Sequence, residues 1–200
     1  MTLPGGAGIS VRPMRTRVLL TTTWLLAFTL LAGCASTETA AKAPPKLDVV
    51  WVPTPPEVIE VMLNLANVGP KDLVYDLGCG EGEILIAAAK RGARGVGVDL
   101  DPVRITNARA NAKKAGVADR ITFFQQDLFK TDVSKATVVT LYLLPELNER
   151  LRPTLLKTLQ PGTPVVSHDF AMGDWQPEQT VEVSLTRTHR AYLWRIPPRP

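Results

Sequence analysis

The chain has few of the residues that small proteins use for cross-links or metal sites. Of its 200 residues, two are cysteine, Cys34 and Cys79, and two are histidine. Two distant cysteines cannot build a disulfide framework, and they lack the paired spacing of a zinc site, so no metal site is predicted. No internal repeat is visible, which excludes a repeat array. We therefore expect a single hydrophobic core, in a chain of the usual size for one domain.

Excess charge of one sign is also scarce in the part that should fold. The chain carries a net +4, but residues 1–33 hold Arg12, Arg15 and Arg17 and no acidic residue. The remaining residues, 34–200, contain 20 basic and 19 acidic side chains. Because phosphate binding draws on clusters of Lys and Arg, a nearly neutral domain disfavours nucleic acid as a partner.

The apolar run near the N-terminus is short. Residues 18–32 contain no charge, but fifteen residues fall below the roughly 20 that a membrane-spanning helix needs. A basic start, a short apolar run and small residues at its end are typical of a secretory signal. The sequence therefore predicts a signal over 1–33, a small, polar, proline-bearing tether over 34–48, and a folded domain over 49–200.

The end of the predicted signal, Leu31-Ala32-Gly33-Cys34, resembles the lipobox of bacterial lipoproteins. That resemblance implies cleavage before Cys34, lipid on its thiol, and a domain attached to a membrane on its periplasmic or outer side. Ala35 follows the cysteine where inner-membrane lipoproteins have Asp, which is compatible with the outer membrane. The alternative is an uncleaved anchor in which Cys34 has no role. Both alternatives place the basic end inside and the domain outside.

Hydrophobic periodicity in the predicted domain alternates between helical and extended patterns. Helices are expected over 55–66, 84–90, 102–115 and 145–159, strands over 73–77, 95–99, 121–125, 136–144 and 163–168, and a hairpin over 180–185 and 190–196. Thr54 is placed to cap the first helix. This alternation predicts an α/β fold with a doubly wound, mostly parallel sheet and a C-terminal β-hairpin. Ligands of such sheets lie beyond the carboxyl ends of the strands.

The loop after the first predicted strand, Asp76-Leu77-Gly78-Cys79-Gly80-Glu81-Gly82, is rich in glycine. Its glycines permit a tight turn and close approach of a ligand to the backbone. The G-x-G-x-G spacing differs from the G-x-G-x-x-G of dinucleotide sites. A carboxylate at Asp76 suits a ligand with an ammonium group and disfavours a pyrophosphate. Cys79 is interpreted as a small loop residue, because no base stands near it in the sequence.

Two further carboxylates follow the next predicted strands. Asp99 ends the second strand and can accept two hydrogen bonds from vicinal ribose hydroxyls. Asp127, with Leu128, follows the third strand and is placed to hold an adenine. Each carboxylate also has a plainer interpretation: Asp76 as a helix cap, Asp99 as a turn residue and Asp127 as a solvated loop acid.

Three segments, V-Y-D-L-G-C-G-E-G, G-V-G-V-D-L-D-P and Q-Q-D-L-F, together resemble the class I S-adenosylmethionine-dependent methyltransferases over residues 70–170. The resemblance implies S-adenosyl-L-methionine as cofactor, with the glycine loop under its methionine part. Asp76 would lie near the amino group, Asp99 would bind the ribose and Asp127 the adenine amino group. The resemblance also implies contacts of the methionine part with Gly78, Cys79, Gly80 and Gly82 of the loop, and of the adenine with Leu100 and Leu128.

A narrower resemblance adds W-V-P-T-P at 51–55, the aliphatic stretch 136–144, and V-V-S-H-D-F at 165–170. These segments are similar to the small archaeal protein-lysine methyltransferases and to the mitochondrial lysine methyltransferases that modify membrane proteins. By that likeness Pro53 and Thr54 would close over the cofactor. The acceptor channel would be lined by Tyr142, Leu143, Leu144 and Pro145.

The expected reaction is therefore methyl transfer to the ε-amine of a lysine in a membrane-associated protein. The Asn-Pro-Pro-Tyr motif of enzymes that methylate planar nitrogens is missing, which counts against nucleobase and glutamine acceptors. No catalytic base is predicted, since an apolar channel lowers the pKa of a lysine by desolvation. His168 is either a base or a hydrogen-bonded structural residue.

Two other functions stay open. One is a methyltransferase that acts on a small molecule. The other is a lipid-anchored module that binds the cofactor without catalysis, which an export signal favours because S-adenosylmethionine is made in the cytoplasm.

Overall fold

A computed structural model describes residues 52–199. The predicted signal, the tether, Cys34 and Trp51 lie outside the described residues. In chain order the elements are α1 (Pro56–Leu65), β1 (Leu73–Leu77), α2 (Glu83–Lys90), β2 (Arg94–Asp99), α3 (Pro102–Lys114), η1 (Ala118–Arg120), β3 (Ile121–Gln125), η2 (Leu128–Lys130), β4 (Val138–Leu141), α4 (Pro145–Thr158), β5 (Pro164–His168), β6 (Gln179–Ser184) and β7 (Thr188–Arg195).

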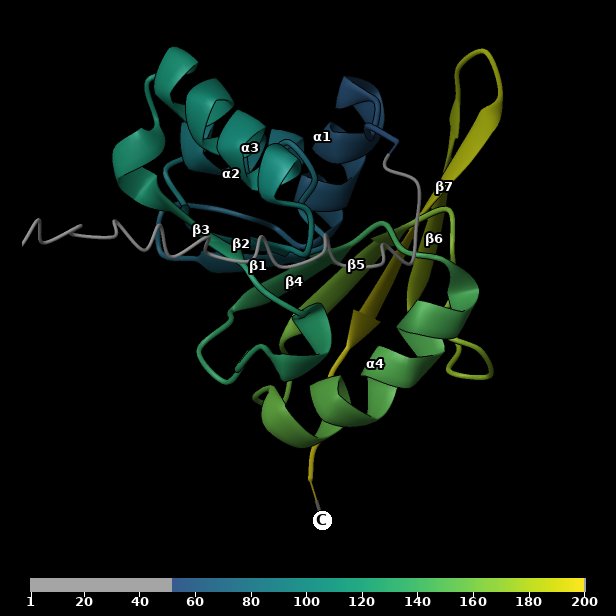
Figure 1. Ribbon diagram of the computed structural model, residues 1–200. Helices are drawn as coiled ribbons and strands as arrows, with labels where there is room; N and C mark the ends of the chain where they lie inside the picture. The colour runs from purple at the N-terminus through teal and green to yellow at the C-terminus, as the bar shows by residue number, and fades with distance from the viewer. Residues whose placement is uncertain (1–51, 200) are drawn as a thin grey trace, which may run out of the picture. The chain divides into compact units, whose positions relative to one another are not determined.

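The strands form one sheet in the order β3-β2-β1-β4-β5-β7-β6 (Figure 1). The five strands from β3 to β5 pair in parallel, whereas β7 runs antiparallel to both β5 and β6. The predicted doubly wound, mostly parallel sheet with a C-terminal β-hairpin is confirmed. The chain enters the hairpin through β6 at the edge and returns through β7, which lies directly against β5.

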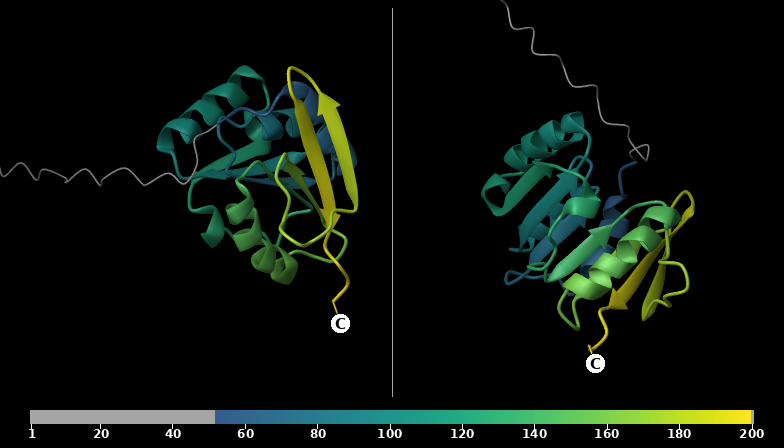
Figure 2. Two further views of the ribbon diagram at one scale, coloured as in Figure 1. Left: turned by 90° about the vertical axis from the view of Figure 1, so that its right-hand side faces the viewer. Right: turned by 60° about the horizontal axis from the view of Figure 1, so that its bottom comes forward.

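Helices cover both faces of the sheet, α1, α2 and α3 on one side and α4 on the other (Figures 1 and 2). Strand β1 shows how the sequence builds these layers. Its residue Val74 belongs to the core under α1–α3, while Tyr75 and Leu77 belong to the core around Leu151 and Leu155 of α4. Successive strand residues point to opposite faces, so a strand buried on both sides has an almost continuous apolar sequence.

Two local predictions need correction. Thr54 does not cap α1, since the N-cap is Pro55 and no side chain caps the helix. Pro55 has no side-chain oxygen that could cap the helix, and the Thr54 hydroxyl, one residue before it, lies 3.2 Å from Nδ1 of His168. Strand β4 ends at Leu141, three residues earlier than predicted, because the chain leaves the sheet there to form the wall of a cavity.

The direction of chain winding reverses between β1 and β4. From β1 the chain proceeds to β2 and β3 on one side, and β4 and β5 are laid down on the other. The carboxyl ends of β1, β2 and β4 therefore meet at one edge with a crevice between their loops, the usual ligand position in such folds. None of the helices within residues 52–199 is both long and apolar enough to cross a membrane.

Candidate functional site

A cavity of about 560 Å³ opens at the carboxyl ends of β1, β2 and β4. Small-molecule sites usually have about 300–1,000 Å³, so this one accommodates a nucleoside-sized ligand. One part of its wall carries four carboxylates and an arginine, and the other part is apolar and aromatic. A ligand with both charged and apolar parts therefore fits this cavity better than a purely apolar one.

The glycine loop forms the floor beside β1. The backbone N–H groups of Gly78 and Cys79 both donate to the carbonyl of Val98, at 2.9 Å each, which joins the loop to β2. Gly78 has a φ of +84°, and a Cβ at this position would lie 2.8 Å from Cδ2 of Leu143. Glycine is thus required here both for the backbone conformation and for the close approach of the apolar wall. Burial raises the pKa of the Cys79 thiol, which keeps it protonated and unreactive.

Asp76 is the deepest acidic group of the cavity. It is 2% exposed, and the Thr140 hydroxyl donates to its Oδ1 over 2.7 Å. Burial raises the pKa of Asp76 to about 7, with the Thr140 hydrogen bond opposing and the charges of Glu83 and Asp99 adding to the rise. A buried carboxylate with one hydrogen-bond donor gains strongly from a ligand cation. The position therefore favours an ammonium group in the ligand.

Asp99, at the end of β2, is held in a fixed orientation by the backbone. Its Oδ2 accepts from the N–H of Gly80 at 3.0 Å, and its Oδ1 accepts from the N–H of Asp101 at 2.9 Å. Each carboxylate oxygen can accept a second hydrogen bond. Asp99 lines the cavity, so these remaining positions can accept two neighbouring hydroxyl groups.

Further charges surround these two carboxylates. Glu83, at the start of α2, lines the cavity, and burial raises its pKa. Arg104 is paired with Glu81 at 2.5 Å and with Asp101 at 3.7 Å. The carboxylates of the lining thus outnumber its one arginine, and the resulting field attracts a cationic ligand.

The opposite wall is apolar and leads to the surface. Tyr142, Leu143 and Leu144 form it directly after β4, and Leu144, which is 39% exposed, marks the mouth. Phe170 faces Tyr142, with ring centroids 6.1 Å apart and planes inclined by 21°. The Phe170 carbonyl accepts from Nδ2 of Asn148 at 3.1 Å, which ties this aromatic residue to α4.

The structure brings together most of the residues predicted from sequence. Those that line the cavity are Thr54, Asp76, Gly78, Cys79, Asp99, Leu100, Leu128, Tyr142, Leu143 and Leu144. The other predicted residues, Pro53, Gly80, Gly82, Asp127 and Pro145, are adjacent in sequence to lining residues or support the loops. Asp127 itself accepts from the N–H of Phe129 at 2.9 Å and so caps η2. Its contact with an adenine stays a prediction.

Several lining residues were not predicted: Val52, Glu83, Ile84, Asp101, Arg104, Gln126, Leu147 and Phe170. Most follow a predicted residue by one to five positions on a helix or loop. Helical periodicity beyond the glycine loop places Glu83 and Ile84 at the first turn of α2, and this signal was available in the sequence.

Comparison with known proteins agrees with this geometry. The chain matches the ANTKMT methyltransferase domain family over residues 76–179. It is 45% identical over 151 residues to a protein-lysine N-methyltransferase of Saccharolobus islandicus, covering 74% of this chain and 94% of that protein. It is 32% identical to the adenine nucleotide translocase lysine N-methyltransferase of Mus musculus, covering 70% of this chain and 61% of that protein.

A crystal structure described as an RNA methyltransferase from Salinibacter ruber in complex with S-adenosyl-L-homocysteine is also similar. Its sequence is 55% identical and its TM-score is 0.71, covering 74% of this chain and 96% of that one. The family match and the relatives agree with the fold and with the resemblance found in the sequence. The chain belongs to the ANTKMT methyltransferase domain family, within the class I S-adenosylmethionine-dependent methyltransferases.

Proposed function

We propose that this chain transfers the methyl group of S-adenosylmethionine to the ε-amine of a lysine in a protein substrate. The observation that carries the proposal is a single cavity that joins the acidic pocket at Asp76 and Asp99 to the apolar wall at Tyr142–Leu144. The archaeal and mouse relatives named as lysine methyltransferases support it.

The residues present fit the cofactor. Asp76 is a buried carboxylate suited to the ammonium of its methionine part, and Asp99 offers two acceptor positions for its ribose hydroxyls. The remaining carboxylates of the lining suit its positive charge. When bound, S-adenosylmethionine supplies a methyl group that is already activated on a sulfonium. The chain therefore has to bind, orient and desolvate the reacting groups, without providing a nucleophile of its own.

The apolar wall explains how the acceptor is prepared. Only a neutral amine can attack, and desolvation between Tyr142, Leu143 and Phe170 lowers the pKa of an entering lysine so that it releases its proton to solvent. Burial raises the pKa of Tyr142, with the charge of Asp169 adding to the rise, so its hydroxyl stays protonated. Tyr142 is thus part of the wall and is not a base.

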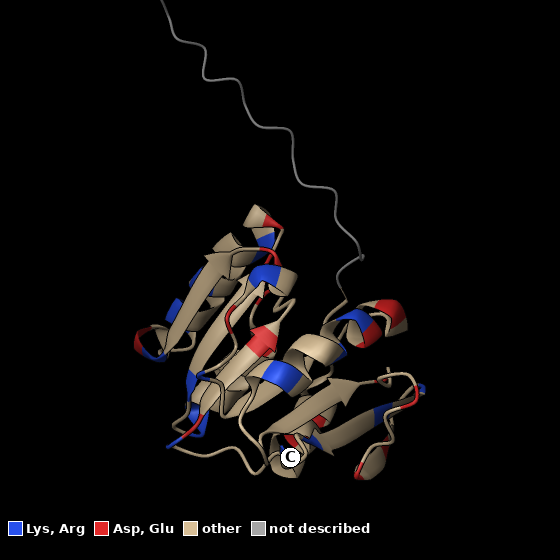
Figure 3. Ribbon diagram, turned by 90° about the horizontal axis from the view of Figure 1, so that it is seen from below, with Lys and Arg blue, Asp and Glu red and all other residues tan. Residues whose placement is uncertain are grey.

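Protein fits the surface of the domain better than RNA does. Residues 52–199 contain 18 basic and 17 acidic side chains. In Figure 3 Lys and Arg are interspersed with Asp and Glu over the ribbon, and neither sign gathers along one side. RNA binding draws on clustered positive charge. The description of the Salinibacter ruber protein makes RNA the competing acceptor in any test.

The acceptor class can be tested directly. The full-length chain, with S-adenosylmethionine carrying a labelled methyl group, is offered cell protein and total RNA together, and the products are digested separately with protease and nuclease. We expect the label in protein and its release as methylated lysine. Label that only nuclease releases would refute the proposal in favour of RNA.

Two matched leucines test the apolar wall. Leu144 and Leu185 are equally exposed, at 39%, but only Leu144 lines the cavity. Leu144→Asp should lower kcat/KM for the protein acceptor by about tenfold or more, because a carboxylate at the mouth favours the charged amine. Leu185→Asp should leave it within about twofold. Equal effects of the two substitutions would exclude Leu144 from the acceptor path.

We also propose that the chain is exported and attached to a membrane through lipid on Cys34. The support is the basic start, the short apolar run and the lipobox-like Leu31-Ala32-Gly33-Cys34. A membrane position fits a membrane-associated protein substrate. Intact mass after membrane extraction should show loss of residues 1–33 and addition of acyl chains. A chain that retains residues 18–32 without acyl chains would indicate a plain anchor instead.

A further inference from the structure

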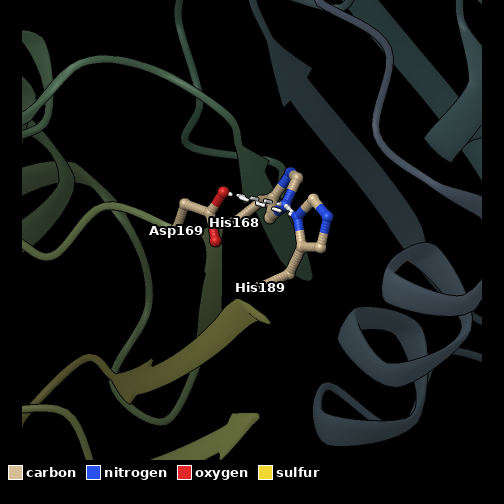
Figure 4. A group of neighbouring side chains, drawn as sticks. All are labelled: His168, Asp169 and His189. Atoms are coloured by element: carbon tan, nitrogen blue, oxygen red, sulfur yellow. Dashed lines mark hydrogen bonds and ion pairs between the residues drawn. The ribbon is translucent and has the colours of Figure 1, made fainter. Parts of the chain in front are cut away.

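A cluster of hydrogen-bonding side chains lies behind the cavity at the end of β5. His168 Nδ1 is 3.2 Å from the Thr54 hydroxyl, and its Nε2 is 2.8 Å from Nδ1 of His189 on β7. The Asp169 Oδ2 lies 3.3 Å from His168 Nε2 and 3.5 Å from His189 Nδ1. Figure 4 shows the two rings and the carboxylate facing one another. One neutral imidazole therefore connects a residue of the cavity wall to the C-terminal hairpin.

These three side chains have the residue types of a metal site, but their other partners argue against one. Asp169 Oδ2 already accepts from Arg187 at 2.7 Å, and Oδ1 accepts from the backbone N–H of Arg190 at 2.8 Å. A divalent cation would have to displace the Arg187 guanidinium or lie beside its positive charge. The cluster is complete as a hydrogen-bonded network, because each ring nitrogen of His168 has its own partner.

His168 is also poorly suited to be a base. It is fully buried, and burial lowers its pKa to about 4, although the charge of Asp169 opposes the shift. The nearby His189 and Arg187 add to the lowering. An effective general base has a pKa near the working pH, and this imidazole is several units below it. His168 thus stays neutral, and its hydrogen bonds hold the neighbouring side chains in place.

The backbone is strained to complete this arrangement. Asp169 has a φ of +58°, in the left-handed region that is uncommon for residues other than glycine. This conformation turns the carboxylate back toward the two histidines and Arg187. Strain of this kind persists only where surrounding contacts impose it, and it concentrates at functional sites.

We propose that His168 is a positioning residue of the methyltransferase site, which fixes Thr54 against the cofactor pocket from behind. The contact that does so is its Nδ1 to the Thr54 hydroxyl, while Asp169 and His189 hold the far side of the ring. The ring also packs against Tyr142, with ring centroids 3.9 Å apart and planes inclined by 36°, so one imidazole supports both the cofactor wall and the acceptor wall. This inference rests on the proposed cofactor of the site and is independent of the acceptor.

Two substitutions at position 168 separate the two sides of the ring. The side-chain amide of Asn takes the place of the histidine Nδ1 and can still form a hydrogen bond with Thr54. The side-chain amide of Gln takes the place of Nε2 and reaches only Asp169 and His189. Binding of S-adenosyl-L-homocysteine to the full-length chain is measured by titration calorimetry, with the melting temperature recorded for each variant. Thr54→Val removes the hydroxyl, and Thr54→Ser keeps it as the matched control.

The positioning role predicts that His168→Gln and Thr54→Val each weaken binding by roughly 3- to 10-fold, because the ligand must then order the segment at Thr54 that this hydrogen bond otherwise holds in place. His168→Asn and Thr54→Ser should stay within about twofold. The double variant of His168→Gln with Thr54→Val should bind no more weakly than the weaker single variant, because both remove the same contact. If the position-168 variants do not fold, the Thr54 pair alone decides the question.

Other outcomes overturn the inference. Equal affinities of the Asn and Gln variants, or lower melting temperatures with unchanged affinities, would mean that the cluster only stabilises the fold. A rise in melting temperature with added Zn²⁺ that is lost in His189→Gln would show a metal site instead. If the unsubstituted chain binds no S-adenosyl-L-homocysteine, the proposed function itself fails, which is a separate result.

Discussion

Asp76→Asn should make the ligand-free protein more stable while weakening its cofactor binding. Asp76 is buried, and its pKa is raised from 3.8 to about 7. Below about pH 4 the carboxyl is neutral in both the folded and the unfolded chain, so it has little effect on stability. Between about pH 4 and pH 7 the unfolded chain ionises while the folded chain keeps its proton. Stability is therefore lost as the pH rises through this window and stays low above it.

The size of the effect follows from the shift. A difference of about three pKa units, at about 1.4 kcal/mol each, amounts to about 4 kcal/mol at pH 8. At about pH 5 only the first part of the window has been crossed, which amounts to about 1.5 kcal/mol. Asparagine carries no charge and can still accept from Thr140, so it removes the penalty at both pH values. The gain from Asp76→Asn should thus be larger by about 2.5 kcal/mol at pH 8 than at pH 5.

Urea unfolding of the unsubstituted protein and of Asp76→Asn at pH 5 and pH 8 measures this difference in stability. An effect of the substitution on packing is the same at the two pH values, so it cancels. Glu57→Gln, which removes an exposed carboxylate at the start of α1, is the control and should change the free energy of unfolding by no more than about 0.5 kcal/mol. A gain from Asp76→Asn that is the same at pH 5 and pH 8 would refute the raised pKa. Binding of S-adenosyl-L-homocysteine should weaken at least tenfold in Asp76→Asn, since the buried charge for its ammonium is lost.

Two further substitutions probe the loops. Asp99→Ala removes the acceptor for two ligand hydroxyls and for the backbone N–H groups of Gly80 and Asp101. It should weaken S-adenosyl-L-homocysteine binding by about 1.5–3 kcal/mol in titration calorimetry. An unchanged affinity would exclude Asp99 from the site. Gly78→Ala should destabilise the protein more than Gly116→Ala, although both glycines have a positive φ. A Cβ at position 78 would lie 2.8 Å from Leu143, whereas a Cβ at position 116 would have no neighbouring atom within 4 Å. We expect a difference of about 1–3 kcal/mol in urea unfolding, and equal losses would mean that the Leu143 contact is unimportant.

The order of elements and most of the cavity could be predicted because the relevant signals are local. The helices and strands near the glycine loop follow from apolar periodicity, and Asp76 and Asp99 each lie at the end of a strand of the parallel part of the sheet. Parallel strands align their carboxyl ends, so residues that end neighbouring strands converge even when they are far apart in the sequence.

The tertiary contacts of the hairpin and of the segment before α1 could not be predicted from local sequence patterns. His189 meets His168 only because β7 inserts between β5 and β6, an order that the hairpin pattern does not specify. Thr54 has the residue type of a helix cap, but α1 begins one residue later than its sequence pattern indicates, with Pro55 as N-cap, and the Thr54 hydroxyl lies within hydrogen-bonding distance of His168 instead. Phe170 follows β5 after a left-handed Asp169, a turn that the sequence Ser-His-Asp-Phe does not reveal.

The most direct test of the proposed reaction is tandem mass spectrometry of acceptor proteins after incubation with the full-length chain and S-adenosylmethionine that carries a deuterated methyl group. We predict the label on the ε-nitrogen of lysine, and much less of it when Asp99→Ala replaces the unsubstituted chain at a cofactor concentration below saturation. Label found in RNA or in a small metabolite, with none on lysine, would contradict the proposed acceptor.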